Sequence, residues 1–168
     1  MKHKVLRKKS NSNKCIVCGL NNEIGLEAEF FELDNGEVVA ICTPKEEHQS
    51  YPGRVHGGIS TALLDETIGR AIEIYNPDAW GVTVELSTRF KKPVPLGEEI
   101  KIIGRITRNT SRIFEGTGEI ILKNGDVAVT AQGKYMKMSI DKIVSNENAG
   151  EEEMTLNIKD TDPTEIEY

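Results

Sequence analysis

One long helix is predicted among about six strands, and this ratio limits the folds available to the chain. The helix covers about residues 57–75 and ends before Pro77, because the residue before a proline disfavours the helical conformation. Its apolar residues lie on more than one side, which is typical of a helix buried nearly all round. The helix is therefore expected at the centre of the core.

Apolar segments bounded by turn residues predict two strands before this helix and four after it. The predicted ranges are 25–33, 37–43, 81–91, 98–108, 112–122 and 127–138. Turn sequences at 34–36 and 124–125 separate two of the pairs. Repeating βαβ units are excluded because one helix serves all the strands. The simplest arrangement is an α+β fold, in which a curved antiparallel sheet of about six strands wraps around one central helix.

The chain has 168 residues, 38% hydrophobic and 29% charged, which is typical of one soluble globular domain. No apolar run is long enough to span a bilayer, and the basic start of the chain lacks the apolar stretch of a secretory signal. Three cysteines without such a signal indicate a reducing compartment, so we expect a cytoplasmic location.

The distribution of charged residues along the sequence divides the chain into three expected regions. Residues 1–14 carry only basic charges and are expected to form a solvated, mobile arm. Residues 15–145 are expected to form the folded domain. Residues 146–168 form an acidic tail with few large apolar residues, which predicts loose order. A net charge of -6 and the lack of a recognition helix disfavour nucleic acid as a partner.

The helix start carries the candidate chemistry. Val55-His56-Gly57-Gly58 precedes it, and the first N–H groups of a helix have no intrahelical acceptor, so they can stabilise an oxyanion. Asp65 lies inside the helix with no cation three or four positions away, and a carboxylate in apolar surroundings can act as a base. Glu66 stands four residues before Arg70, which indicates a structural surface ion pair.

Helical geometry separates the two halves of this candidate site. Gly58 and Asp65 share one face but lie about 10 Å apart along the axis, at about 1.5 Å per residue. A single carbonyl group cannot touch both at once. If both act on one carbonyl, they come from two antiparallel helices, which predicts a two-fold dimer with composite sites.

The segment Tyr51-Pro52-Gly53-Arg54-Val55-His56-Gly57-Gly58, followed by Leu64-Asp65, resembles the hot-dog fold thioesterases of the phenylacetate-pathway and thioesterase-superfamily-member type. Gly81-Val82-Thr83-Val84-Glu85 and Pro93-Val94-Pro95-Leu96-Gly97-Glu98 match the following strand and hairpin of that family in order and spacing. The resemblance covers about residues 15–139. It implies a hot-dog fold, an acyl-CoA substrate, and a homodimer or a dimer of dimers. We expect no cofactor.

The resemblance also implies the catalytic roles. Asp65 would activate a water or attack directly to form an anhydride, and these two routes stay open. The Gly57 N–H would belong to the oxyanion hole. Thr83 would hold the attacking water with Asp65, and strand alternation predicts that it shares a face with Glu85 and Ser87. His56 is expected to position the turn through a hydrogen bond, with direct proton transfer as the alternative.

Substrate binding is expected at Gly58, at the loop before the helix, and at one hairpin. Many relatives carry an Asn six residues before the histidine, which polarises the thioester carbonyl, whereas this chain has Ser50, so Gln49 or His48 is expected to replace it. The hairpin 108–112 offers cations and hydroxyls that suit a phosphate. Solvated turn charges are the alternative there. The residues expected to contact the CoA phosphates are Arg108, Ser111 and Arg112.

Cys15 and Cys18 are spaced like half of a zinc knuckle, but a structural zinc usually needs four ligands. The remaining candidates show no ligand spacing; they are Cys42, His3, His48 and His56. We expect no metal and two idle reduced thiols, with redox pairing or a zinc shared between subunits as alternatives.

The leading functional hypothesis is an acyl-CoA thioesterase. A hydratase or dehydratase acting on acyl thioesters is the first alternative, which usually needs a His and a carboxylate converging on the substrate, with His48 as the possible His. A non-catalytic acyl-CoA-binding module is the second. The segment before Cys15 is too short to hold the DNA-binding domain that such sensors carry, which disfavours the second alternative.

Overall fold

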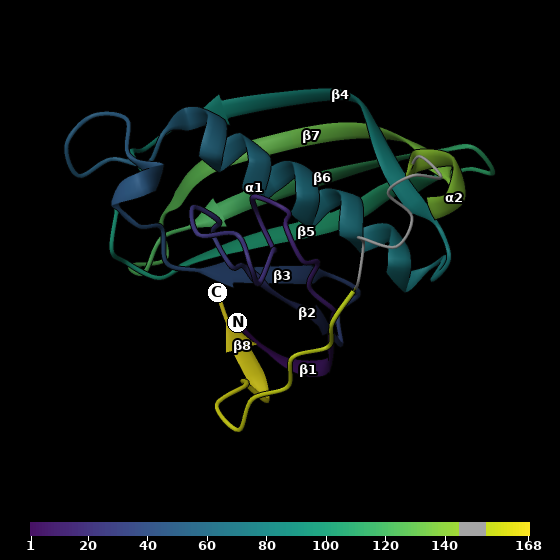
Figure 1. Ribbon diagram of the computed structural model, residues 1–168, viewed down its shortest axis with the longest axis horizontal. Helices are drawn as coiled ribbons and strands as arrows, with labels where there is room; N and C mark the ends of the chain where they lie inside the picture. The colour runs from purple at the N-terminus through teal and green to yellow at the C-terminus, as the bar shows by residue number, and fades with distance from the viewer. Residues whose placement is uncertain (145–153) are drawn as a thin grey trace.

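The computed structural model describes residues 1–144 and 154–168. Within them, eight strands form one antiparallel sheet in the order β4-β7-β6-β5-β3-β2-β1-β8. The sheet curves around the central helix α1, Gly57–Arg70, which lies across its concave face (Figure 1). This is the hot-dog arrangement that the sequence predicts.

Most elements lie close to their predicted ranges. The strands are β1 Lys2–Lys8, β2 Glu29–Leu33, β3 Val38–Cys42, β4 Trp80–Phe90, β5 Ile100–Asn109, β6 Ile113–Ile121, β7 Val127–Met138 and β8 Glu165–Glu167. The short helices are η1 Glu46–His48, η2 Ala71–Ile74 and α2 Ile140–Ile143. The predicted helix therefore splits into α1 and the tighter 3₁₀ turn η2, which is a common way for a helix to end. No helix in the described ranges is long and apolar enough to cross a membrane.

The number of strands differs from the expected six because both ends of the chain add one. β1 pairs with β2 and with β8, and the two termini lie side by side (Figure 1). Residues 1–14 thus do not lie free in solvent, and 154–168 are not loosely attached. Residues 146–153 of the expected acidic tail lie outside the described residues.

Opposite charges from distant parts of the chain explain why the basic start joins the sheet. Lys8 pairs with Glu29 at 2.8 Å and with Asp162 at 2.6 Å, and its own side chain is 5% exposed. Lys9 is similarly buried and pairs with Glu73 at 2.9 Å. A buried ammonium is tolerated only when it is paired in this way.

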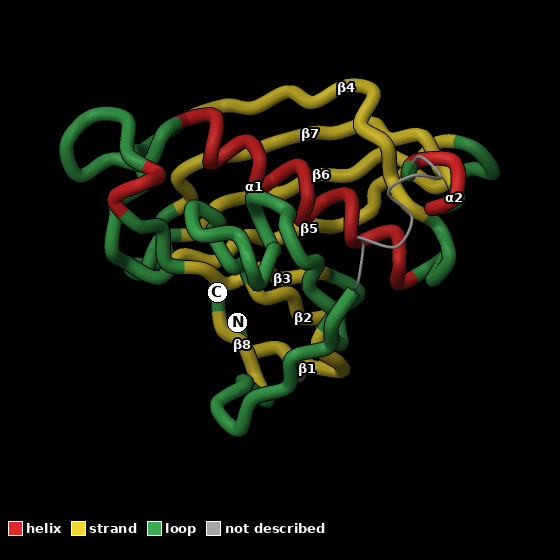
Figure 2. Tube along the Cα trace, viewed as in Figure 1, coloured by secondary structure: helices red, strands yellow, loops and turns green. Residues whose placement is uncertain are grey.

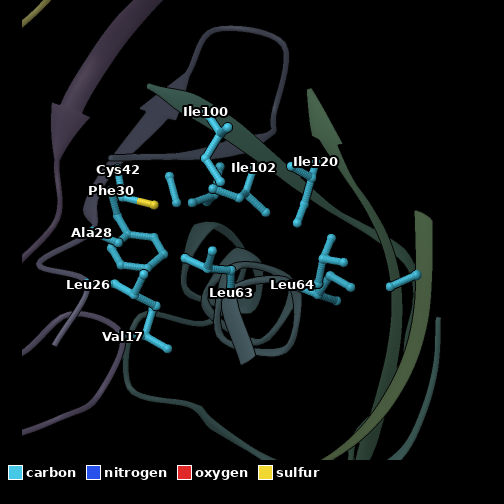
Figure 3. Close-up of a cluster of buried hydrophobic side chains, with 14 of the residues drawn as sticks. Val17, Leu26, Ala28, Phe30, Cys42, Leu63, Leu64, Ile100, Ile102 and Ile120 are labelled. Carbon is cyan, nitrogen blue, oxygen red and sulfur yellow. The ribbon is translucent and has the colours of Figure 1, made fainter. Parts of the chain in front are cut away.

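The core lies between α1 and the concave face of the sheet. Leu63, Leu64 and Ile68 of α1 are fully buried. Figure 3 shows Leu63 and Leu64 among the side chains that form this cluster, including Phe30 of β2 and Ile120 of β6. Burying one such side chain typically contributes about 1.5–3 kcal/mol, so α1 is held to the sheet mainly by its apolar residues.

The helix approaches the sheet so closely that one strand position has room only for glycine. A Cβ atom on Gly104 of β5 would lie 2.6 Å from the carbonyl oxygen of Thr67 and 3.0 Å from the Ile68 nitrogen. These are backbone atoms of α1, which cannot rotate away. Gly104 therefore sets the distance between α1 and β5.

The loop between β1 and β2 covers another part of the same core (Figure 2). Val17, Cys18 and Leu26 from this loop are buried in the cluster that contains Leu63 and Leu64. The Asn11 amide donates to the carbonyls of Cys18 and Ala28, which ties the two ends of the loop together. The loop is therefore packed into the fold rather than lying over it.

Candidate active site

His56 closes the N-terminus of α1. It is the N-cap residue, and its Nδ1 accepts the Gly58 N–H at 2.9 Å. A ring nitrogen that accepts a hydrogen bond carries no proton, so the neutral ring has its proton on Nε2. The turn-positioning hydrogen bond expected for His56 is thus present, and Nδ1 is already in use.

The two glycines at this helix start differ in what their N–H groups do. Gly58 donates to His56, whereas the Gly57 N–H precedes the first intrahelical bond and finds no acceptor among the described residues. The free Gly57 N–H is therefore the better oxyanion donor of the two. The Phe90 ring of β4 lies 3.4 Å from the place of a Cβ on Gly57, so a Cβ there would be in contact with that ring.

Asp65 and Thr83 meet between α1 and β4. The Thr83 hydroxyl lies 2.9 Å from one carboxylate oxygen of Asp65 and 3.1 Å from the other, and it donates its single proton there. Asp65 is half-buried and forms no ion pair within the described ranges. A carboxylate without a cation to neutralise it remains available as a base or nucleophile.

A β-bulge turns Thr83 towards Asp65. Thr83 lies opposite Tyr135 of β7, but Glu85 lies opposite the next residue, Lys134, so Val84 is the additional residue. Leu86, beyond the bulge, packs against the core on the side of α1. The expectation that Thr83 shares a face with Glu85 and Ser87 is therefore wrong, because the bulge shifts the alternation by one position.

Tyr135 also contacts Asp65, and the sequence analysis did not identify it as a site residue. Its hydroxyl donates to the backbone carbonyl of Asp65 at 3.2 Å, and its ring stacks on Phe114 at 4.9 Å. Burial, together with the charge of Asp65, raises the pKa of Tyr135 above its usual range. The hydroxyl therefore stays protonated and remains a donor. Tyr135 is identified by its position opposite Thr83, which is known only when the pairing of β4 with β7 is known.

Glu66, the neighbour of Asp65, points elsewhere. It accepts from Arg70 at 3.0 Å and from the thiol of Cys15 at 3.0 Å. The pair with Arg70 forms as expected, but it is largely buried rather than at the surface, since the Arg70 side chain is 9% exposed. Its partners make Glu66 a structural carboxylate.

Of the two candidates for the missing carbonyl donor, only Gln49 remains free to act. His48 is buried, and its Nδ1 accepts the Lys45 N–H at 2.9 Å while its Nε2 lies 2.8 Å from the Ile24 carbonyl. Both ring nitrogens of His48 are thus occupied by backbone. Gln49 is exposed, and its side-chain oxygen accepts the Gly53 N–H at 3.3 Å, which leaves its amide NH₂ for a ligand.

The β5–β6 hairpin is exposed, and a lysine of the neighbouring strand β7 contacts it. Arg108, Ser111 and Arg112 are all exposed there. Lys137 of β7 donates to the Thr110 carbonyl of this hairpin at 2.6 Å and lines an open cavity of about 580 Å³ together with Lys142. Lys137 is a further candidate that strand alternation alone did not indicate.

Comparisons with known proteins find matches in the thioesterase superfamily. The thioesterase superfamily profile matches residues 52–129, which include the helix start, Asp65 and Thr83. Human acyl-coenzyme A thioesterase 13 is 26% identical over 102 residues, covering 61% of this chain and 72% of the relative.

Two solved structures extend the comparison. A crystal structure of a thioesterase superfamily protein has a TM-score of 0.66 and 31% identity, with 73% of this chain covered, although the chain spans only 59% of that protein. A hypothetical thioesterase from Streptococcus pneumoniae, solved with coenzyme A, has a TM-score of 0.60 and 20% identity, covering 67% of this chain and 86% of its own. The second likeness shows the fold alone. The chain therefore has the hot-dog fold and is similar to the thioesterase superfamily over residues 52–129.

Proposed function

We propose that this protein is an acyl-CoA thioesterase, which hydrolyses a thioester to a free acid and CoA. The hydrogen bond between Thr83 and Asp65 carries the proposal, because it places a hydroxyl where it can hold one water together with a carboxylate that has no ion pair among the described residues. The name of the human relative and the coenzyme A in the streptococcal structure support this substrate class.

In the proposed reaction, Asp65 takes a proton from the water that Thr83 orients, and the water oxygen attacks the thioester carbon. The carbon–sulfur bond then breaks, and the CoA thiolate leaves and takes up the proton from Asp65. The Gly57 N–H of a second subunit stabilises the negative charge on the carbonyl oxygen, an effect typically worth about 10²–10³ in rate. Direct attack by Asp65, which gives an anhydride, uses the same residues. Gln49 and the glycine backbone at Gly58 lie beside the thioester.

CoA phosphates are proposed to bind the β5–β6 hairpin. The exposed guanidinium groups of Arg108 and Arg112 and the hydroxyl of Ser111 offer suitable donors, and Lys137 adds a charge beside them. The alternative of a hydratase is weaker, because His48 has both nitrogens bonded to backbone.

The proposed function is tested by incubating the chain with a panel of acyl-CoA esters and following free CoA thiol. Short, long and aryl acyl groups distinguish chain length from head-group preference. Turnover of at least one ester by the wild type, and loss of it in Asp65→Asn, supports the proposal. Binding of acyl-CoA without turnover would instead identify a binding module.

Thr83→Ala is expected to lower kcat by about 10-fold or more with little change in KM, because the lost hydroxyl acts mainly in the transition state. Thr83→Ser keeps the hydroxyl and should retain most of the activity. Steady-state kinetics and melting temperatures of both variants provide the measurement. A normal kcat with a lowered melting temperature in Thr83→Ala would show that Thr83 only packs.

A second subunit is proposed to complete each site, because the Gly57 N–H and Asp65 stand about two turns apart on one helix. The sheet has an edge suited to such contact. β4, 11 residues long, has β7 as its one neighbour in the described sheet, and its Val84 and Phe90 side chains are 55% and 53% exposed. A long edge strand with exposed apolar residues favours association.

We therefore expect the active protein to be a dimer or a dimer of dimers. Sedimentation at the protein concentrations used for the assay should show a dimer or a tetramer rather than a monomer. Mixing the inactive Asp65→Asn variant with a Gly57→Val variant should restore activity, since a hybrid dimer contains one intact composite site. A stable monomer with full activity would refute the composite site.

A further inference from the structure

Two cysteines of the β1–β2 loop lie against the side of α1 that carries Glu66 and Arg70. The sulfur atoms of Cys15 and Cys18 and a carboxylate oxygen of Glu66 lie within 4.8 Å of one another. Cys15 donates to Glu66 at 3.0 Å, and Arg70 donates to the Cys18 sulfur at 3.1 Å. The proposed thioesterase reaction uses none of these four side chains.

The surroundings of the two sulfurs differ in a way that assigns them different chemistry. The Cys18 sulfur is buried and faces donors on several sides: the Arg70 guanidinium, the Ser12 N–H at 3.5 Å and the Ser12 hydroxyl at 3.3 Å. The interaction with Cys15 lowers the pKa of Cys18, against burial and the charge of Glu66, which raise it, and the Arg70 guanidinium adds to the lowering. These contacts favour a thiolate at Cys18.

Cys15 is the outer sulfur of the pair. It is half-buried, and its thiol donates to the Glu66 carboxylate at 3.0 Å. The hydrogen bond to Cys18, burial and the charge of Glu66 all raise the pKa of Cys15. Because Cys15 is half-buried whereas Cys18 is fully buried, Cys15 is the thiol that a small oxidant can reach, and Cys18 lies behind it.

A tight turn brings the two sulfurs to the same side. The Gly19 N–H donates to the Cys15 carbonyl at 2.8 Å, which closes one helix-like turn in which residues three apart face the same way. Only glycine fits after Cys18, because a Cβ on Gly19 would lie 2.5 Å from the Cys15 carbonyl oxygen. The turn thus holds the sulfurs close enough for side-chain rotation to join them.

We propose that Cys15 and Cys18 form an oxidisable dithiol site, which a small-molecule disulfide converts reversibly into an intramolecular disulfide. The Cys15 thiol passes its proton to the Cys18 thiolate, and the Cys15 sulfur attacks one sulfur of R–S–S–R, forming Cys15–S–S–R and releasing RS⁻, which takes the proton back from Cys18. The Cys18 thiolate then attacks the Cys15 sulfur, and the bond to the R–S group breaks. The protein loses two electrons, and the two released thiolates take up protons to give two RSH.

The same cluster is a poor zinc site. It offers three ligand atoms, from Cys15, Cys18 and Glu66, whereas a structural zinc takes four. The guanidinium of Arg70 is hydrogen-bonded to both Cys18 and Glu66, so a cation already lies beside the space between the ligands. After oxidation Arg70 keeps Glu66 and the Ser10 carbonyl as partners, which lets the fold survive the change.

The test uses the reduced full-length chain incubated with glutathione disulfide, followed by thiol counting in denaturant, intact mass and peptide mapping. Of the three free cysteines, two should lose their thiols. The mass should fall by two hydrogen atoms, and the map should join Cys15 to Cys18. Dithiothreitol should restore all three thiols. Three unreacted thiols, or glutathione remaining on Cys15, would overturn the proposal.

Two matched variants separate this site from general thiol oxidation. Cys42→Ser should behave as the wild type, because Cys42 is 6% exposed and burial raises its pKa to about 12. Cys18→Ser should retain glutathione on Cys15, since no second sulfur displaces it. One zinc per purified chain, released only when these thiols are modified, would instead show that the cluster is a metal site.

Discussion

Asp65→Asn is expected to lower kcat by about 10²- to 10⁴-fold, the range that a positioned acid or base contributes. Asparagine has nearly the same shape and can still accept the Thr83 hydroxyl, but it cannot take a proton or act as a nucleophile. The half-buried carboxylate has no ion pair within the described chain, so the melting temperature should change little. Steady-state kinetics with the best acyl-CoA ester and a thermal melt measure both effects.

Glu66→Gln is the matched control, since it makes the same chemical change on the neighbouring residue. It should keep kcat near the wild-type value but lower the stability by about 1–3 kcal/mol, because it weakens the partner of the buried Arg70. The opposite order, with Glu66→Gln inactive and Asp65→Asn active, would show that the wrong carboxylate has been assigned to the reaction.

Gly104→Ala is expected to lower the free energy of unfolding by about 1–3 kcal/mol, as overpacking of a core does. The added Cβ would lie 2.6 Å from the Thr67 carbonyl oxygen, so α1 must move away from β5. Because α1 carries Asp65, activity should also fall. Urea unfolding and steady-state kinetics provide the two readouts.

Gly69→Ala makes the same substitution on α1 where there is room. The nearest atom to its added Cβ is a ring carbon of Tyr135 at 3.6 Å, an ordinary contact. Alanine is favoured over glycine inside a helix by about 0.5–1 kcal/mol, so this variant should be more stable than the wild type. Equal stability of the two variants would contradict the close approach of α1 to β5.

Local sequence signals predicted much of the fold. The helix start at Gly57 and the range of β7 agree with the structure, because an apolar pattern bounded by glycine, proline and turn residues depends only on neighbours in the chain. The arrangement of a curved antiparallel sheet around one buried helix followed from the order of the predicted elements, and the family resemblance implied that it is a hot-dog fold. The candidate residues Asp65 and Thr83 were also chosen from the sequence, and the structure brings their side chains together.

Contacts between distant residues account for what the sequence did not predict. The basic start became β1 because its lysines meet acidic partners such as Glu29 and Asp162, far along the chain. The surface pair expected for Glu66 proved to be largely buried, since the β1–β2 loop packs over it.

The sequence by itself determined the central helix, the hairpins and the types of residue at the candidate site, since each depends on local propensity and spacing. The tertiary structure decided which groups meet. The bulge at Val84 turns Thr83 towards Asp65, and β-strand pairing brings Tyr135 to the Asp65 carbonyl. Neither is visible in the sequence, because a bulge and a cross-strand partner arise only when strands far apart in the chain settle into one register.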